Sequence, residues 1–563
     1  MGRSAAELIV EGRVATLAGE TGFGWQAGVA IADGRVVAVG PPAQLDALAG
    51  PGTTRWRLGD GLLAMPGITD AHLHLMSLAL AERQVDLTDA AGLDGALARL
   101  ADANRAWLAV GDAESWLVGH GWSLNGLGAW PNAELLDRAA PGRPVALYAH
   151  DHHSRWLSST ALRLAGIGRA TVDPDGGLIR RDETGQPTGM LHETACVLVD
   201  PAIPDPERDE IETSLARTAA TLAALGVTGC HDPGELSADR QVVRGPLVYR
   251  SLAERGKLPL RVHASVRATQ LEHAIEMGLR SGQGVRPETD DRLTARRAAR
   301  YRMGWLKLFA DGSLGSRSAA LLEPYADSVA NPPTGGPRGM YLSRPGELRA
   351  LLLRAAAAGI DGQVHAIGDG AVRMALDVLG DVPPGVLRRR VEHSQLVHPA
   401  DVPRFGRLGI AASVQPVHLR SDAAPARAAW GDRADEAFPL APLAASGALI
   451  PFGTDAPVEP PEPWPGIAVA ICRRDPFSPA DEPLGDRHAI DLARAIRAAC
   501  LDPAQVAGEE GLGRLVVGQS ADLLVVPSDG FGEPFDPAVL AATRPLATLI
   551  DGELVHRADR FEA

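Results

Sequence analysis

Short apolar runs alternate with helical segments rich in Ala, Leu and Arg through most of this 563-residue chain. Residues 206–224 begin with acidic side chains, follow a helical period and stop before Gly226, where a new apolar run starts. Residues 345–358 repeat this arrangement before the run 362–365. Such alternation is typical of parallel strands joined by helices. We therefore predict an α/β fold built on a (β/α)8 TIM-like barrel, for which the chain is long enough.

Both ends of the chain are rich in strand patterns. Near the start, two alternating runs flank Asp33-Gly34, and near the end two more flank Asp551-Gly552. Asp-Gly between alternating runs favours a two-residue type I′ hairpin. Because neither end is large enough to form its own core, we predict that they pack together. The expected unit is a small β-sandwich domain built from residues 1–64 and 508–563.

The remaining residues, 65–507, are assigned to the barrel, with one interruption. Residues 75–205, approximately, contain too few strand–helix units for their length and are predicted to be an insertion after the first barrel strand. Their content of Gly, Trp and Pro, as in Gly119-His120-Gly121-Trp122, indicates irregular structure.

Charge and cysteine content restrict the classes of partner and compartment. The chain has 55 basic and 70 acidic residues, a net charge of −15, which argues against a nucleic-acid or anionic membrane partner. Its beginning leads into an alternating strand rather than a signal-peptide core, and no apolar run is long enough to span a membrane. The four cysteines form no C-x-x-C pair. We expect a protein of the reducing cytoplasm.

Polar residues follow several of the apolar runs. His72 and His74 follow the run that starts at Met65, and residues two apart on an extended backbone point to the same side. His365, His393 and Asp455 likewise follow apolar runs; their full order is His72, His74, His365, His393 and Asp455. Barrel enzymes draw their ligands from this end of the strands. Any one such histidine is more often structural, but the shared position predicts a metal site.

Lys307 stands out because the chain contains only two lysines, Lys257 and Lys307, among its 55 basic residues. It lies between apolar neighbours on an expected buried strand. A desolvated amine near metal ions can lose its proton, and it can then take up CO₂ to form a carbamate whose two oxygens bridge two cations. The alternative is a structural lysine, which either extends its amine to the surface or forms an ion pair.

Together these residues resemble the metal site of the amidohydrolase superfamily, and further motifs resemble its YtcJ-like branch, which includes N-substituted formamide deformylase. The motifs are Pro66-Gly67-x-x-Asp70-x-His72-x-His74, Gly119-x-Gly121-Trp122, Asp151-x-His153-x-x-Trp156, Gly226-Val227-Thr228-x-x-His231-Asp232, Lys307-x-Phe309-x-Asp311-Gly312-Ser313-Leu314-Gly315-Ser316-Arg317 and His365-Ala366-Ile367-Gly368-Asp369. They extend over nearly the whole chain. His152 and His120 depart from the branch, where Gly and Arg are usual, and both departures concern the substrate pocket.

The resemblance implies two divalent metal ions, expected to be zinc. Their expected ligands are His72, His74, His365, His393, Asp455 and a carboxylated Lys307 that bridges the ions. Asp455 would also transfer a proton from the attacking water to the leaving amine. His231 and Arg317 would stabilise the oxyanion or bind a substrate carbonyl, and the pocket would be lined by Trp122, His153 and Trp156.

The function that follows is metal-dependent hydrolysis of a C–N bond in a small molecule: an N-substituted formamide, another amide, a cyclic amide or a carbamate. One alternative is a deaminase or isomerase with a single metal ion on the same barrel, although such a site needs no bridging lysine. Another is a non-catalytic binding protein, although metal binding alone does not require Asp455 as a proton carrier. The expected partner is a small-molecule substrate, and a homodimer is left open.

Overall fold

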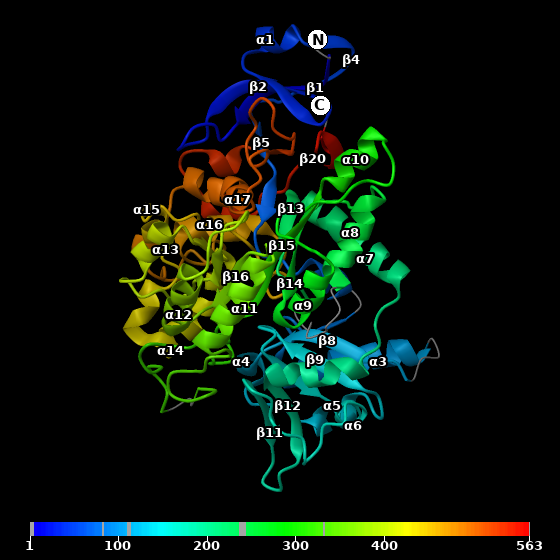
Figure 1. Ribbon diagram of the computed structural model, residues 1–563, viewed down its shortest axis with the longest axis vertical. Helices are drawn as coiled ribbons and strands as arrows, with labels where there is room; N and C mark the ends of the chain where they lie inside the picture. Colours follow the sequence, from blue (N-terminus) through cyan, green and yellow to red (C-terminus); the bar gives the residue numbers. More distant parts are fainter. Residues whose placement is uncertain (1–4, 82–83, 110–113, 236–243, 330–332, 562–563) are drawn as a thin grey trace.

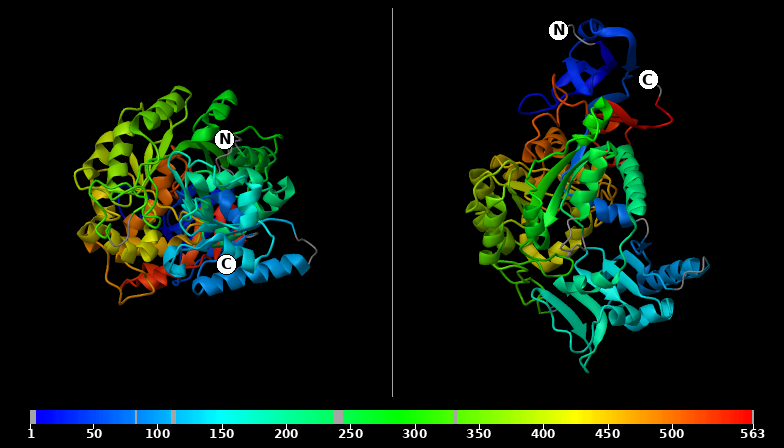
Figure 2. Two further views of the ribbon diagram at one scale, coloured as in Figure 1. Left: turned by 90° about the horizontal axis from the view of Figure 1, so that it is seen from below. Right: turned by 45° about the vertical axis from the view of Figure 1, so that its right-hand side comes forward.

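The computed structural model describes residues 5–81, 84–109, 114–235, 244–329, 333–561. Three parts follow one another along its longest axis (Figures 1 and 2). A sheet that contains strands from both chain ends lies at one end of the molecule, a barrel lies in the middle, and residues between the first two barrel strands form the other end.

The barrel contains a sheet of seven parallel strands that pair in chain order. These are β6 (Ile68–Asp70), β13 (Val227–Asp232), β14 (Arg261–Arg267), β15 (Tyr301–Phe309), β16 (Gly362–Ala366), β17 (Arg390–His393) and β18 (Ala411–Ser413). Residues 449–452 occupy the eighth position: Phe452 forms a parallel bridge to Val414, and its carbonyl accepts a hydrogen bond from Ala71 N beside β6. The ring is therefore closed, and the predicted TIM-barrel-like fold is confirmed.

Helices connect the strands as the sequence pattern predicts. The two helices predicted at residues 206–224 and 345–358 are α7 (Arg208–Ala224) and α11 (Pro345–Ala357). Glu207 and Glu210 form a capping box at the start of α7, and Pro345 occupies the first turn of α11. Each helix is followed by a glycine with positive φ, Gly226 (φ 91°) and Gly359 (φ 79°). The helices of the barrel are α7 (Arg208–Ala224), α8 (Arg244–Glu254), α9 (Leu271–Glu276), α10 (Arg292–Ala298), α11 (Pro345–Ala357), α12 (Asp369–Gly380), α13 (Val402–Leu408), α14 (Leu419–Trp430), α15 (Leu440–Ala445), α16 (Pro463–Cys472) and α17 (Leu492–Val506).

Strands from both chain ends share one eight-stranded sheet, in the order β21-β20-β19-β5-β1-β2-β3, with β4 paired to β1. At both predicted hairpins the two central residues have positive φ, as a type I′ turn requires: 51° and 74° at Asp33-Gly34, 52° and 71° at Asp551-Gly552. That the ends form a β-sandwich stays a prediction. The elements are β1 (Ala6–Ala15), β2 (Trp25–Ala32), β3 (Arg35–Val39), α1 (Pro42–Asp46), β4 (Ala49–Arg57), β5 (Leu62–Pro66), β19 (Leu523–Pro527), α18 (Pro537–Ala541), β20 (Ala547–Ile550) and β21 (Glu553–Arg557).

Residues 75–205, predicted to be irregular, contain a six-stranded sheet in the order β11-β12-β10-β9-β8-β7. The prediction of irregular structure was therefore wrong. The glycines and tryptophans of this segment serve the sheet. A Cβ at Gly119 would lie 2.5 Å from Val85 O on the neighbouring strand, and Trp122 packs edge-on against Trp156 in the sheet's core. The elements are α2 (Leu75–Ala81), β7 (Val85–Asp86), α3 (Gly92–Ala109), β8 (Leu117–Trp122), α4 (Leu124–Leu127), α5 (Ala133–Ala139), β9 (Val145–Ala149), β10 (Ser154–Leu157), α6 (Ser159–Leu164), β11 (Gly177–Arg181) and β12 (Pro187–Glu193).

Burial extends along the whole length of four barrel strands. Every residue of β13, β14, β16 and β17 is buried, and this includes polar and charged side chains such as Arg390 and Glu392 as well as the apolar ones. Across the described ranges, no helix has both the length and the apolar character needed to cross a bilayer.

Candidate metal centre and pocket

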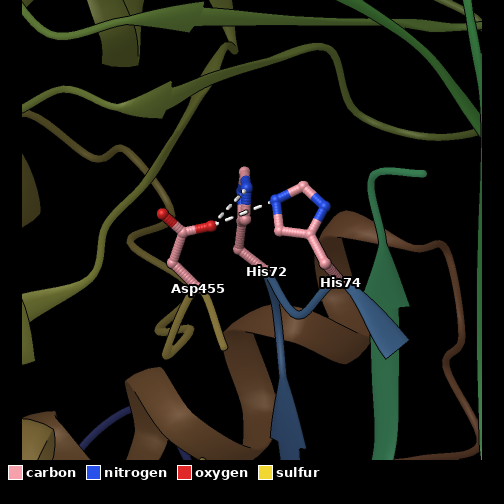
Figure 3. Close-up of side chains that lie close together, drawn as sticks. All are labelled: His72, His74 and Asp455. Carbon is pink, nitrogen blue, oxygen red and sulfur yellow. Dashed lines mark ion pairs between the residues drawn. The ribbon is translucent and has the colours of Figure 1, made fainter. Parts of the chain in front are cut away.

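Three of the predicted ligands converge on one point at the carboxyl ends of the strands (Figure 3). His72 and His74 follow β6, and Asp455 follows the eighth strand position with a positive φ of 64°. Oδ1 of Asp455 lies 3.3 Å from Nε2 of His72 and 3.2 Å from Nε2 of His74. Two imidazoles from one edge of the ring and a carboxylate from the adjoining segment therefore share a small volume.

The opposite ring nitrogens of both histidines are already engaged. Nδ1 of His72 lies 2.5 Å from Oε2 of Glu392, and Nδ1 of His74 lies 2.5 Å from the carbonyl oxygen of Gly234. Because both partners are acceptors, each Nδ1 donates and each Nε2 directs a lone pair toward Asp455. Nε2 of His72 and Oδ1 of Asp455 are buried without a hydrogen-bond partner.

This donor set fits a divalent cation. Imidazole nitrogens and a carboxylate oxygen that face one another without a proton between them are the arrangement that a metal ion stabilises. Burial and the nearby Lys307 lower the pKa of His72 to about 4, so its imidazole is neutral and able to coordinate at neutral pH. The described residues therefore contain a well-formed candidate metal centre.

A second group of ligand atoms adjoins the first and consists of His393, His418 and Asp455. Nε2 of His418 lies 3.3 Å from Oδ2 of Asp455. His365, which the sequence places here, is in neither group of three, but its ring lies 4.5 Å from that of His393, measured between centroids. Its Nε2 is 3.0 Å from the carbonyl oxygen of Gly312.

Lys307 lies on β15, and 1% of its surface is exposed. Burial lowers the pKa of its amine to about 7, far below the ordinary value for lysine. Among the described residues no carboxylate oxygen lies within 4.0 Å of its Nζ, so the structure provides no structural ion pair for it. Its surroundings thus make the neutral amine accessible near neutral pH.

A cavity of about 710 Å³ extends from these residues to the six-stranded sheet. Its wall includes five of the predicted ligands together with Lys307, and two of the predicted pocket residues, Trp122 and His153. Apolar side chains from both sides contribute, among them Trp130, Phe309, Leu314 and Ile367. The cavity is large enough for a small organic molecule.

His153 is held on the cavity wall by a carboxylate. Its Nδ1 lies 2.7 Å from Oε2 of Glu193, whose other oxygen accepts hydrogen bonds from Ser316 and Ser318. Burial opposes the charged imidazolium, but Glu193 outweighs this effect and raises the pKa of His153 to about 9. The six-stranded sheet therefore presents a protonated histidine to the cavity.

The structure does not bring three of the predicted site residues to the cavity wall. His231 is buried against Trp305 and accepts a hydrogen bond from Arg390. Arg317 forms an ion pair with Asp327. Trp156 is fully buried, and its indole N–H donates to the carbonyl of Asn132. Their predicted roles in binding or stabilising the substrate receive no support from this geometry.

Two residues at the site were missed by the sequence analysis. His418 comes shortly after the apolar run that starts at Ile410, so the rule that identified His365 and His393 also applied to it. Glu392 directly precedes His393 on β17, and its carboxylate contacts the ring of His72. No local pattern distinguishes such a carboxylate from an ordinary buried one.

Comparison with known proteins agrees with the fold and the site. The model of the Amidohydrolase family matches residues 60–556. YtcJ of Bacillus subtilis (strain 168) is 31% identical over 533 residues, 94% of this chain and 95% of that protein. The N-substituted formamide deformylase of Arthrobacter pascens is 26% identical, covering 93% and 94% of the two chains.

Among solved structures, an uncharacterised metal-dependent hydrolase from Pyrococcus horikoshii OT3 superposes with a TM-score of 0.71 at 25% identity, covering 98% of this chain and all of that one. This neighbour and the His/Asp ligand groups support a divalent metal ion in this chain. Amidohydrolases cleave carbon–nitrogen bonds other than peptide bonds. The chain is a member of the amidohydrolase family, in its YtcJ-like branch, and is accordingly a hydrolase of this kind.

Proposed function

We propose that this hydrolase cleaves the C–N bond of an amide-type small molecule with water activated at the centre formed by His72, His74 and Asp455. The observation that carries the proposal is the convergence of these three side chains at the wall of a cavity of about 710 Å³. The Nδ1 atom of each histidine is hydrogen-bonded to an acceptor, which leaves its Nε2 to face Asp455. Buried ligands that leave a cavity open beside them are the arrangement of catalytic rather than structural metal sites.

We propose two divalent metal ions, expected to be zinc. His72 and His74 would hold one, and His365 and His393 the other, with Asp455 between them and Lys307, carboxylated, as the bridge. His418 is a further candidate ligand because it shares Asp455 with His393. Ions bound by these residues would polarise a substrate carbonyl group and lower the pKa of a bound water to about 7.

Asp455 is placed to move the proton. Its Oδ2 faces His418 and its Oδ1 faces the two histidines that follow β6, so the carboxylate is fixed at the edge of the cavity. In the proposed reaction it accepts a proton from the attacking water and donates it to the leaving nitrogen. That transfer matters because an amide anion is a poor leaving group.

His153 and Trp122 are proposed to bind the substrate. Held by Glu193, the His153 imidazolium is a hydrogen-bond donor suited to a substrate oxygen. Trp122, whose indole N–H donates to the carbonyl of Leu147, offers an apolar surface. Substrates consistent with this wall are N-substituted formamides, the substrates named for the relative from Arthrobacter pascens, and also other amides, cyclic amides or carbamates.

A release assay over N-formyl and N-acyl amines, cyclic amides and carbamates tests the proposal. Amine release should depend on added zinc and should fall by orders of magnitude in Asp455→Asn. Release that persists in metal-free protein would overturn the metal mechanism. Release of ammonia from a ring amine in place of amide cleavage would identify a deaminase instead.

A further inference from the structure

A buried line of side chains leads away from the candidate metal centre into the barrel. Nδ1 of His72 lies 2.5 Å from Oε2 of Glu392, and the other oxygen of Glu392 lies 2.5 Å from Nε of Arg390. Nη1 of Arg390 lies 3.0 Å from Nδ1 of His231. These contacts join His72 to His231, the motif residue that the structure keeps away from the cavity wall.

Glu392 is held at both of its oxygens by different partners. Oε2 accepts from the His72 ring, and Oε1 forms the ion pair with Arg390. Glu392 and Arg390 are fully buried, so water does not compete for either contact. Oε1 has no hydrogen-bond partner and is held by the charge of Arg390, while Oε2 is hydrogen-bonded to His72. This restrained carboxylate orients the His72 ring and the lone pair of its Nε2.

Arg390 is in turn held by Gln363 and Trp305. Gln363 accepts from its Nε and Nη2 at 3.0 Å and 2.6 Å, and its guanidinium lies 4.1 Å from the centre of the Trp305 ring. A guanidinium only donates, so Nδ1 of His231 must be the acceptor of the remaining contact. The proton of the neutral His231 ring is then on Nε2.

We propose that His231 and Arg390 are positioning residues for the metal ligand His72, acting on it through Glu392. The inference rests on the proposed metal centre and assigns His231 a role at a distance from the substrate. His74 differs, because its Nδ1 faces the backbone carbonyl of Gly234 rather than a side chain. Changes in the line should therefore weaken the hold of one ligand and leave the other intact.

Three variants separate this role from simple packing. Glu392→Gln keeps the shape of the side chain but turns an amide NH₂ group toward either His72 or Arg390, both of which are donors. Metal affinity should therefore fall about 10–100-fold. His231→Leu removes the acceptor for Arg390 and should weaken metal binding several-fold. His231→Asn should restore most of the affinity, because the amide oxygen of asparagine occupies the place of Nδ1.

His263→Leu is the matched control. His263 is also buried and its ring packs 4.9 Å from that of His231, but its Nε2 faces Glu509, and it accepts no hydrogen bond from Arg390 among the described residues. This variant should lose stability to a similar degree as His231→Leu and keep the metal affinity of the wild type.

Metal affinity is measured by competition for zinc with a chromophoric chelator, together with the visible spectrum of the cobalt-loaded full-length protein. Urea unfolding of the metal-free variants reports stability separately. Glu392→Gln, which changes almost no volume, carries the test if His231→Leu does not fold. If Glu392→Gln and folded His231→Leu bound zinc as tightly as the wild type, the positioning role would be wrong while the proposed function would stand. An equal loss of zinc affinity in His263→Leu would have the same meaning. A wild-type protein that binds no metal would overturn the proposed function as well.

Discussion

Nε2 of His74 and Oδ1 of Asp455 lie 3.2 Å apart at the seam where the barrel closes. His74 follows the first barrel strand and Asp455 follows the eighth strand position, so only closure of the ring makes them neighbours. An imidazole lone pair and a carboxylate at this distance repel each other unless a proton or a metal ion lies between them. The arrangement makes metal binding the first property to test.

Removing the metal should abolish activity and lower stability. Dialysis against a strong chelator is expected to eliminate amine release, and zinc should restore it. Metal present at 100 times its dissociation constant should stabilise the fold by about 2.7 kcal/mol. Metal analysis, activity and thermal unfolding before and after dialysis provide the measurement; a chelated protein with undiminished turnover would contradict the prediction.

Asp455→Asn should separate catalysis from metal binding. The amide keeps a coordinating oxygen but cannot carry the proton, so the variant should retain most of its metal. Its kcat should fall by about 10²–10⁴-fold. Metal content and turnover on one verified substrate decide the result, and unchanged turnover would remove the assigned role of Asp455.

Substitutions of Lys307 test the carbamate. Lys307→Ala should lose one metal ion and most of the activity, and a short carboxylic acid in the buffer should partly restore both. Lys307→Arg should stay inactive because guanidinium keeps its proton and cannot take up CO₂. Lys307→Glu should retain some metal. A structural lysine gives the reverse order, with Arg tolerated best, and an active Lys307→Arg enzyme with two metal ions would exclude the carbamate.

The ion pair of His153 with Glu193 should make stability depend on pH. The pKa of His153 is about 9 in the folded protein and about 6.5 in an unfolded chain, so the folded state binds the extra proton between these values. The contribution is complete below pH 6.5 and is lost as pH rises through 9, with a slope of at most about 1.4 kcal/mol per pH unit.

Urea unfolding of the wild type and of His153→Gln between pH 6 and 10 measures this contribution. The difference between the two unfolding free energies should narrow as pH rises through the window, because glutamine does not titrate. A difference that stays constant with pH would show that folding does not raise the pKa of His153, and it would remove the imidazolium from the proposed substrate contacts.

Local patterns in the chain predict the strands, helices and turns that depend on neighbouring residues. The Asp-Gly pairs at residues 33–34 and 551–552 adopt the positive φ values of type I′ turns. The ends of α7 and α11 lie where glycines interrupt the helical period. The spacing of His72 and His74 places both rings on one side of the chain because alternate residues of an extended backbone share a face.

The six-stranded sheet was missed because its signals are contacts between distant residues. Gly119 was interpreted as a loop residue, yet its small size is required by the approach of Val85 on another strand. Trp122 and Trp156 are apolar in any arrangement, but only the fold places the first at the cavity and the second in the core. Composition within one segment contains no record of such pairings.

The sequence by itself determined the predicted barrel and the candidate ligands, because strand and helix periodicity and the His-x-His spacing are local properties of the chain. The family followed from the resemblance of its motifs. Only the tertiary structure decided which side chains support those ligands. Glu392, Arg390 and His231 come from strands that pair into one barrel, and their hydrogen bonds depend on ring closure and on the register between strands. Those quantities follow from long-range packing, which no single stretch of the sequence specifies.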